Sequence, residues 1–149
     1  MIDRLKKESI VDENLYVDTD RLPEICYTKS ERVIKAANRD FDKIIIVVDA
    51  EGPANRDRVF EGVDVHIPEE IKSKVDIVIL DYMIEEWICY SSRIPFGGDK
   101  PSKALNDWCK NTRGTKRGYK KWQLPNFVNN LNIDKLMNYP SFKDFANAF

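Results

Sequence analysis

The sequence has no apolar stretch long enough to cross a bilayer. A membrane-spanning helix needs about 20 consecutive apolar residues, and the aliphatic run Ile44 to Val48 is far shorter. The charged start of the chain, Met1 to Lys7, is not followed by the apolar core of a secretion signal. With 42% hydrophobic and 33% charged residues in a chain of 149, we expect one soluble, cytoplasmic domain and no membrane partner.

Cysteine and histidine are scarce. The three cysteines, Cys26, Cys89 and Cys109, are widely spaced and contain no Cys-x-x-Cys pair. The sequence has a single histidine, His66. This content argues against both a disulfide framework and a zinc site.

Glycine-rich phosphate loops are also missing. Gly97 and Gly98 lack the further glycines and the Lys-Ser/Thr pair of a P-loop. They lie in the stretch Pro95 to Pro101, which is the clearest break in the chain. We expect it to separate a sheet core, about 14–94, from a basic and helical C-terminal extension, about 100–149.

The stretch Lys43 to Gly52 is the strongest structural signal. An aliphatic run without polar alternation predicts a strand of a parallel sheet, buried on both faces. It ends in Asp49 and Glu51, whose carboxylates point to the same side if the extended conformation continues, so that they share one divalent cation. The alternative is that these acids are simply solvated at the end of a strand.

Other segments predict an α/β fold with a mostly parallel central sheet flanked by helices. A second aliphatic run, Val75 to Leu80, again ends in an acid, Asp81. The remaining expected elements are a strand at 14–18, a helix from Ser30 to Ala37, a strand at 63–67, and helices at 69–74, 83–92, 102–110, 125–131, 133–137 and 141–149.

The acids that follow the two aliphatic strands are candidates for one site. Ligands of open α/β sheets bind beyond the carboxyl ends of the strands. If the two strands are neighbours, Asp49, Glu51, Asp81 and Glu85 come to one edge. Glu85 and Glu86 also suit the first turn of a helix for a purely structural reason, the positive end of its dipole.

Charge is strongly divided along the chain. Residues 40–86 contain thirteen acids and five bases, and residues 100–121 contain eight bases and one acid. This division suggests a metal-binding part and a phosphate-binding part, although such runs also solvate surfaces and pair within a fold. Trp108, Tyr119 and Trp122 interleave the basic block and suit either packing or base stacking. The candidate phosphate or nucleic-acid contacts are Lys103, Lys116, Arg117, Lys120 and Lys121.

Five short motifs occur in an order that resembles a known family. They are Asp-Ala-Glu-Gly-Pro at 49–53, Met-Ile-Glu-Glu-Trp-Ile at 83–88, Lys-Pro at 100–101, Tyr-x-Lys at 119–121 and Pro-Ser-Phe-Lys-x-Phe at 140–145. In this order they are similar to an uncharacterised Toprim-like domain family, distantly related to RloB and OLD-type Toprim nucleases. The resemblance covers roughly residues 40–149.

The resemblance implies a Rossmann-like Toprim fold with a magnesium site. The metal pair falls on Asp49 and Glu51, and the family acid before the tryptophan falls on Glu85. Lys121 matches the lysine of Tyr-x-Lys, and we expect Glu85 and Lys121 to take part in catalysis. The chain departs from Toprim nucleases because no Glu-Gly follows a first strand; Asp18 and Asp20 are the nearest substitutes.

Two functions remain open from the sequence. The first is a Mg- or Mn-dependent nuclease, or another phosphoryl-transfer enzyme acting on DNA or RNA, with Asp49, Glu51, Glu85 and Asp81 as candidate metal ligands. The second is a catalytically inactive module that binds nucleic acid or a protein partner through its basic segment. A third, weaker candidate is a small-molecule phosphate site on an ordinary doubly wound sheet.

Overall fold

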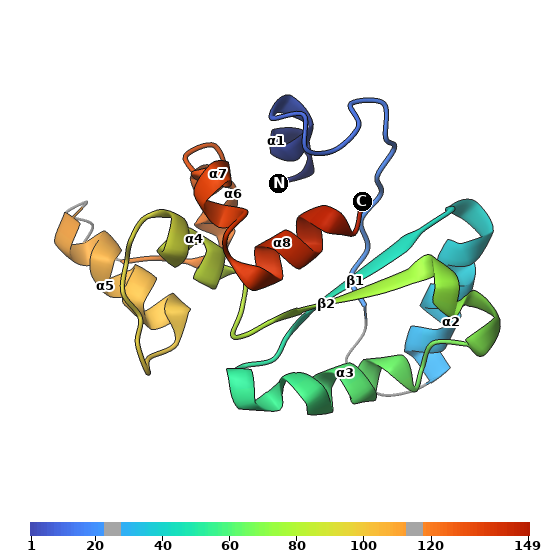
Figure 1. The fold of residues 1–149 in the computed structure, drawn as a ribbon. Coiled ribbons are helices and arrows are strands. Elements are labelled where there is room, and N and C mark those ends of the chain that lie inside the picture. The colour runs from blue at the N-terminus through green and yellow to red at the C-terminus, as the bar shows by residue number, and fades with distance from the viewer. Residues whose placement is uncertain (23–27, 113–117) are drawn as a thin grey trace.

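The computed structural model describes residues 1–22, 28–112 and 118–149. It is an α/β structure, and the sheet of the described residues consists of two parallel strands, β1 (Ile44–Asp49) and β2 (Val75–Leu80) (Figure 1). Ile44 pairs with Val75 and Asp49 with Leu80, so both strands end at the same edge. Within the described ranges, no helix is long and apolar enough to cross a membrane.

Two apolar clusters pack on opposite faces of this sheet. One contains Ile46 and Val48 of β1 and is covered by α2 (Thr28–Asp40) and α3 (Arg56–Asp64). The other contains Val78 and Leu80 of β2. Figure 1 shows α2 and α3 on one side of the strands and α8 (Pro140–Asn147) on the other.

The helices of the second cluster are one near the start of the chain and those that follow β2. They are α1 (Ile2–Lys7), α4 (Glu85–Ser91), α5 (Pro101–Thr112), α6 (Leu124–Val128), α7 (Ile133–Leu136) and α8. Trp87 and Phe142 lie edge to face at its centre, with ring centroids 5.0 Å apart. The C-terminal extension therefore shares one core with the sheet.

The burial on both faces that was expected for β1 is wrong, whereas β2 shows it in its second half. Val78 and Ile79 of β2 are both buried, in different clusters. In β1, Val47 is 40% exposed while Ile46 and Val48 are buried. An aliphatic run therefore does not imply coverage of both faces, because β-branched residues also favour the half-covered strand of a small sheet.

The expected strand at 63–67 is wrong, since α3 extends to Asp64 and a turn follows it. Val63 and Ile67 are each 5% exposed, whereas Val65 is 73% exposed. Apolar residues at positions 59, 63 and 67 recur every four residues, and both a strand and a helix can produce this spacing on one side. Here the helix meets the core with Val59 and Val63.

The expected strand at 14–18 is also wrong. The segment is irregular, and it does not pair with β1 or β2. Tyr16 is 77% exposed and stacks on Phe41, with ring centroids 6.2 Å apart. Short apolar alternation does not make a strand without a hydrogen-bonding edge beside it.

The other expected elements are confirmed with shifted ends. The predicted helix at 69–74 is a 3-10 helix, η2 (Glu69–Lys74). Two further 3-10 helices are η1 (Pro53–Asn55) and η3 (Lys121–Gln123). The chain thus runs from β1 through η1, α3 and η2 into β2, which makes a parallel strand–helix–strand unit whose carboxyl edge carries the candidate acids.

Candidate active site

The chain beyond β1 stays bound to the chain beyond β2. The backbone N–H of Ala50 donates to the Leu80 carbonyl (2.9 Å), that of Glu51 to Tyr82 (3.2 Å) and that of Gly52 to Asp81 (2.7 Å). These bonds fix the position of Asp49 at the end of β1. They also bring the two acidic segments side by side, which meets the condition for one site at this edge.

Asp49 and Glu51 do not lie on one continuous extended segment. Glu51 has a φ of 55°, in the left-handed region. The backbone is therefore not extended from Asp49 to Glu51, which was the condition for the two carboxylates to point to the same side. The Glu51 carboxylate instead accepts a hydrogen bond from the Lys100 amino group at 3.1 Å, and both side chains are more than half exposed.

Asp49 experiences the charges of three other candidate residues. Its pKa is raised, mainly by partial burial of the carboxyl group; Glu85 and Glu51 raise it further, and Lys121 opposes the shift. These effects decay with distance. Asp49, Glu51, Glu85 and Lys121 therefore belong to one electrostatic neighbourhood at the carboxyl edge of the sheet.

Glu85 is the most unusual member of this group. It is fully buried in the first turn of α4. The Tyr119 hydroxyl donates to its Oε1 at 2.9 Å, but its Oε2 has no hydrogen-bond partner among the described residues. Burial raises the pKa of Tyr119, and the hydrogen bond to Glu85 and the charge of Glu85 raise it further. Tyr119 therefore stays a donor. An unpartnered buried carboxylate oxygen is costly unless a donor or a cation satisfies it.

Asp81 is engaged elsewhere. Its Oδ1 accepts from the Arg56 guanidinium at 2.5 Å, and the same Arg56 nitrogen donates to the Ile79 carbonyl at 3.0 Å. Each of the two charged side chains is about one-third exposed. The structure thus places Asp81 near the edge but in an ion pair that stabilises the turn after β2.

The candidate phosphate contacts separate into three groups. Lys120 and Lys121 are exposed at the end of the basic block, after the residues 113–117 that are not described. The charge of Lys121 lowers the pKa of Asp49. Lys103 pairs with Asp99 at 2.9 Å on the surface of α5. Lys116 and Arg117 lie outside the described residues.

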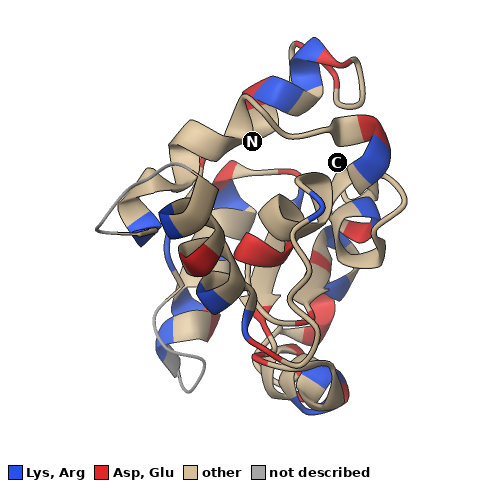
Figure 2. Ribbon diagram, turned by 90° about the vertical axis from the view of Figure 1, so that its left-hand side faces the viewer, with Lys and Arg blue, Asp and Glu red and all other residues tan. Residues whose placement is uncertain are grey.

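The acidic and basic blocks of the sequence meet at this edge. The Lys100–Glu51 ion pair joins them directly, and Lys121 acts on Asp49. Elsewhere the two signs are mixed, and Figure 2 shows both colours on most parts of the ribbon. The acidic and basic blocks, which are separate in the sequence, are therefore partly paired with each other in the fold.

Sequence reasoning did not assign Glu86 and Ser141 any role in a shared network. Glu86 is fully buried; its Oε2 accepts from the Tyr82 N–H at 2.8 Å, and its Oε1 accepts from the Ser141 hydroxyl at 2.6 Å. The Trp87 indole donates to the same Ser141 oxygen at 2.9 Å. No local sequence signal connects residues more than fifty positions apart.

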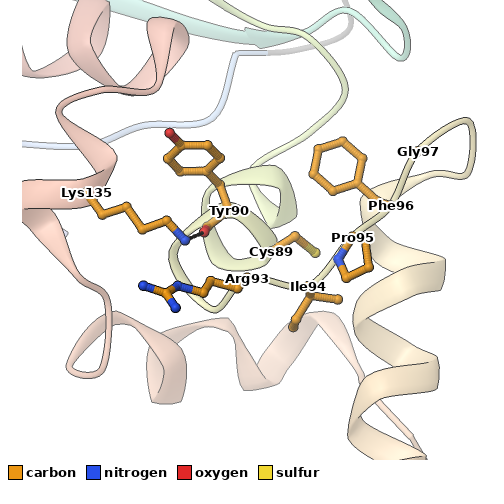
Figure 3. A pocket seen from close by; sticks show the side chains of 8 residues that line it. All are labelled: Cys89, Tyr90, Arg93, Ile94, Pro95, Phe96, Gly97 and Lys135. Carbon is orange, nitrogen blue, oxygen red and sulfur yellow. Dashed lines mark hydrogen bonds between the residues drawn. The ribbon is translucent and has the colours of Figure 1, made fainter.

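A different hollow lies at the C-terminal end of α4. It has a volume of about 330 Å³ and is lined by residues at the end of α4, in the loop after it and in α7 (Figure 3). Lys135 donates to the Tyr90 carbonyl there at 2.5 Å. Burial raises the pKa of the Cys89 thiol to about 12, which leaves it a poor nucleophile. None of the candidate site residues lines this hollow.

The donor set fits a divalent cation in part. Two carboxylates, those of Asp49 and Glu85, share one neighbourhood, and one buried oxygen lacks a partner. Across the described ranges, however, no three acidic, histidine or cysteine side chains converge on one point. Comparison of the chain with protein-family models, with curated proteins and with solved structures finds no match.

Proposed function

We propose that the carboxyl edge of the sheet is the active site of a metal-dependent phosphoryl-transfer enzyme that cleaves nucleic acid. The observation that carries the proposal is geometric: residues 50–52 are hydrogen-bonded to residues 80–82 where the two parallel strands end, and the Oε2 of Glu85, in the helix that follows, has no partner among the described residues. Acids beside a lysine at such an edge suit a cation and a phosphate together. The Rossmann-like Toprim fold, the magnesium dependence and a cytoplasmic location are parts of the same proposal.

Asp49 and Glu85 would hold the cation. Asp49 offers a carboxylate at the end of β1, and Glu85 offers the buried Oε2 that lacks a hydrogen-bond donor. Mg²⁺ and Mn²⁺ favour such oxygen ligands. When bound, the cation supplies Lewis-acid stabilisation to a phosphodiester and lowers the pKa of a bound water.

The surrounding residues orient and balance these two acids. Tyr119 fixes one oxygen of Glu85 by donating to it at 2.9 Å. Lys121 is exposed, and its positive charge lowers the pKa of Asp49, so it would be available to bind a phosphate oxygen. Lys100 holds Glu51 in an exposed ion pair, so Glu51 is available to the cation only after this pair opens.

The second candidate is a catalytically silent module that binds nucleic acid. It is favoured by one observation: Glu51 and Asp81 are paired with Lys100 and Arg56 instead of facing Glu85. Within the described residues, the Asp18 and Asp20 carboxylates accept hydrogen bonds from the backbone N–H of the next residue, Thr19 and Arg21. An acid matching the first-strand glutamate of Toprim nucleases is not brought to the edge by the described part of the first forty residues.

The test is cleavage of labelled DNA and RNA by the purified full chain in Mg²⁺ or Mn²⁺. We expect cleavage that chelation stops and that Asp49→Ala or Glu85→Gln abolishes. The matched control is Asp76→Ala, which removes an acid from the other end of β2, where Asp76 pairs with Lys43 at 2.8 Å. It should retain cleavage.

Cation binding is measured separately from chemistry. A ligand at about 100 times its dissociation constant raises the free energy of unfolding by about 2.7 kcal/mol. Mn²⁺ should therefore stabilise the wild type and Asp76→Ala, but not Asp49→Ala. Cation-independent nucleic-acid binding without cleavage would select the silent module, and cleavage that survives Asp49→Ala would refute the proposed site.

A further inference from the structure

Trp122 is the exposed aromatic residue nearest in the chain to the candidate site. It is 73% exposed, and no hydrogen bond or ring contact among the described residues holds its indole. By contrast, Tyr16 is stacked on Phe41, and Trp87 is only 1% exposed. A tryptophan left in water in this way keeps a large apolar surface available for a ligand.

The segment that carries Trp122 is firmly anchored. The Gln123 N–H donates to the Lys120 carbonyl at 2.8 Å, and the Lys120 N–H donates to the Gln123 side-chain oxygen at 2.7 Å. Just before this turn, the Tyr119 hydroxyl is bound to buried Glu85 and its N–H to Asn106. The exposed indole is thus presented by a fixed turn, which limits the entropy lost on binding.

The approach to this segment is equally constrained. Gly118 has a φ of +61°, and a Cβ there would lie 2.1 Å from the Asn106 Oδ1. Only glycine fits such a close approach in this conformation. The turn 120–123 therefore has a defined position relative to Glu85 and to the carboxyl edge of the sheet.

Charge identifies the class of ligand. Trp122 directly follows Lys120 and Lys121, both exposed, and Lys121 acts on Asp49. Lys121 and Trp122 lie in the same short helix, η3, so one exposed turn offers both a phosphate contact and an aromatic surface. Aromatic stacking requires a base whose face is free, as in single strands, whereas the bases of a duplex are stacked on each other.

We propose that Trp122 is a base-stacking platform, and that the site selects single-stranded nucleic acid over duplex. The inference rests on the proposed function for the position of the phosphate, but the stacking contact itself needs neither a cation nor chemistry. Trp122 sets substrate class, while Asp49 and Glu85 set cation dependence. The two assignments are therefore separable by experiment.

The test measures the affinity of the full chain for a fluorescent single-stranded oligodeoxythymidine and for a duplex of equal length, with chelator present. Stacking of one base contributes about 1–3 kcal/mol, so Trp122→Ala should weaken single-strand binding about 5- to 150-fold. Trp122→Phe should keep most of the affinity but lose the indole fluorescence quenched by the oligonucleotide. The duplex should bind more weakly than the single strand to the wild type.

Two controls separate stacking from charge and from general loss of surface. Phe60→Ala removes an aromatic side chain that is 46% exposed on α3, on the other face of the sheet, and should leave binding unchanged. Trp122→Ala should keep the salt dependence of binding, whereas Lys121→Ala should reduce its slope by about one.

Each alternative outcome has a definite reading. Equal binding of single strand and duplex, or wild-type affinity in Trp122→Ala, overturns the stacking platform even if Asp49-dependent cleavage is found. If the wild type self-associates and Trp122→Ala abolishes this while oligonucleotide binding is unchanged, the platform is also overturned, and Trp122 is a contact between copies of the protein. Trp122-dependent single-strand binding without cleavage supports the platform and refutes only the proposed chemistry.

Discussion

Glu85 and Glu86 are neighbours in the first turn of α4, and both are fully buried, yet the fold treats their carboxylates differently. Both oxygens of Glu86 accept hydrogen bonds, from the backbone of Tyr82 and from the hydroxyl of Ser141. Glu85 receives one hydrogen bond, from Tyr119, and its other oxygen has no partner among the described residues. The comparison separates an acid whose two oxygens are both hydrogen-bonded from an acid with one unpartnered oxygen among the described residues.

The surroundings of the two acids explain this difference. Burial raises the pKa of Glu86, while Ser141 and Tyr82 oppose the shift through hydrogen bonds. These partners join the start of α4 to the start of α8, next to the indole of Trp87. Glu85 accepts a hydrogen bond from Tyr119, and its charge raises the pKa of Asp49. A buried acid with every acceptor satisfied is a structural element, and one with an orphan oxygen is a candidate ligand.

The largest expected effect comes from removing the structural acid. Glu86→Ala leaves the N–H groups of Asp81 and Tyr82 and the Ser141 hydroxyl without this acceptor, so we expect it to lower the free energy of unfolding by about 3 kcal/mol. Glu85→Ala removes one acceptor, that of Tyr119, together with the orphan oxygen, and should cost about 1 kcal/mol. Urea unfolding at neutral pH measures both.

These two variants are matched, because each deletes the same atoms from consecutive buried positions of one helix. The cost of the empty volume is similar in both and is largely removed from their difference. Equal losses would show that the hydrogen-bond count does not distinguish the two acids. A greater loss for Glu85→Ala would reverse their assigned roles.

The next effect concerns Ser141, which connects Glu86 with Trp87. Ser141→Ala leaves the buried Trp87 indole N–H without its acceptor and removes a donor from Glu86. We expect a loss of about 2 kcal/mol in the free energy of unfolding, without loss of cation binding at Asp49. Ser73→Ala, at an exposed serine of η2, is the control and should have no effect. Wild-type stability in Ser141→Ala would mean that this bond contributes nothing net.

The sequence predicted which acids lie near the carboxyl ends of the strands, but not which of these acids would be fully hydrogen-bonded and which would not. The aliphatic runs that end in Asp49 and Asp81 are local signals, and they identified both parallel strands of the sheet. Helix periodicity likewise identified α4 and placed Glu85 and Glu86 in its first turn. What local patterns cannot contain is the partner of each acid, since Tyr119 and Ser141 lie more than thirty residues away from Glu85 and Glu86 in the chain.

The same limit explains the two strands that were wrongly expected. A residue pattern reports which side chains seek the core, whereas a strand also needs a neighbouring backbone edge. Residues 14–18 lack such an edge in the described fold, and Val63 reaches the core from a helix. The left-handed conformation of Glu51 was equally hidden, because Gly52 beside it suggested a turn without fixing which residue would bend.

The smallest expected effect is a pH-dependent change at Asp49. Because the pKa of Asp49 is raised in the fold, its stabilising contribution is present below the pKa of the unfolded chain and is lost as the pH rises through the folded value. Asp49→Asn does not titrate, so it should be more stable than the wild type at neutral pH, with a gain that disappears on acidification. Thermal unfolding across this pH range measures the gain.

Asp76→Asn should instead lose its exposed ion pair with Lys43 and be no more stable than the wild type. Added Mn²⁺ should reverse the order of wild type and Asp49→Asn at neutral pH, since the cation needs the ionised carboxylate that the fold disfavours. An Asp49→Asn variant that is less stable than the wild type without metal would show that the Asp49 carboxylate stabilises the fold, as the Glu86 carboxylate does. Asp49 would then no longer group with Glu85 as a candidate ligand.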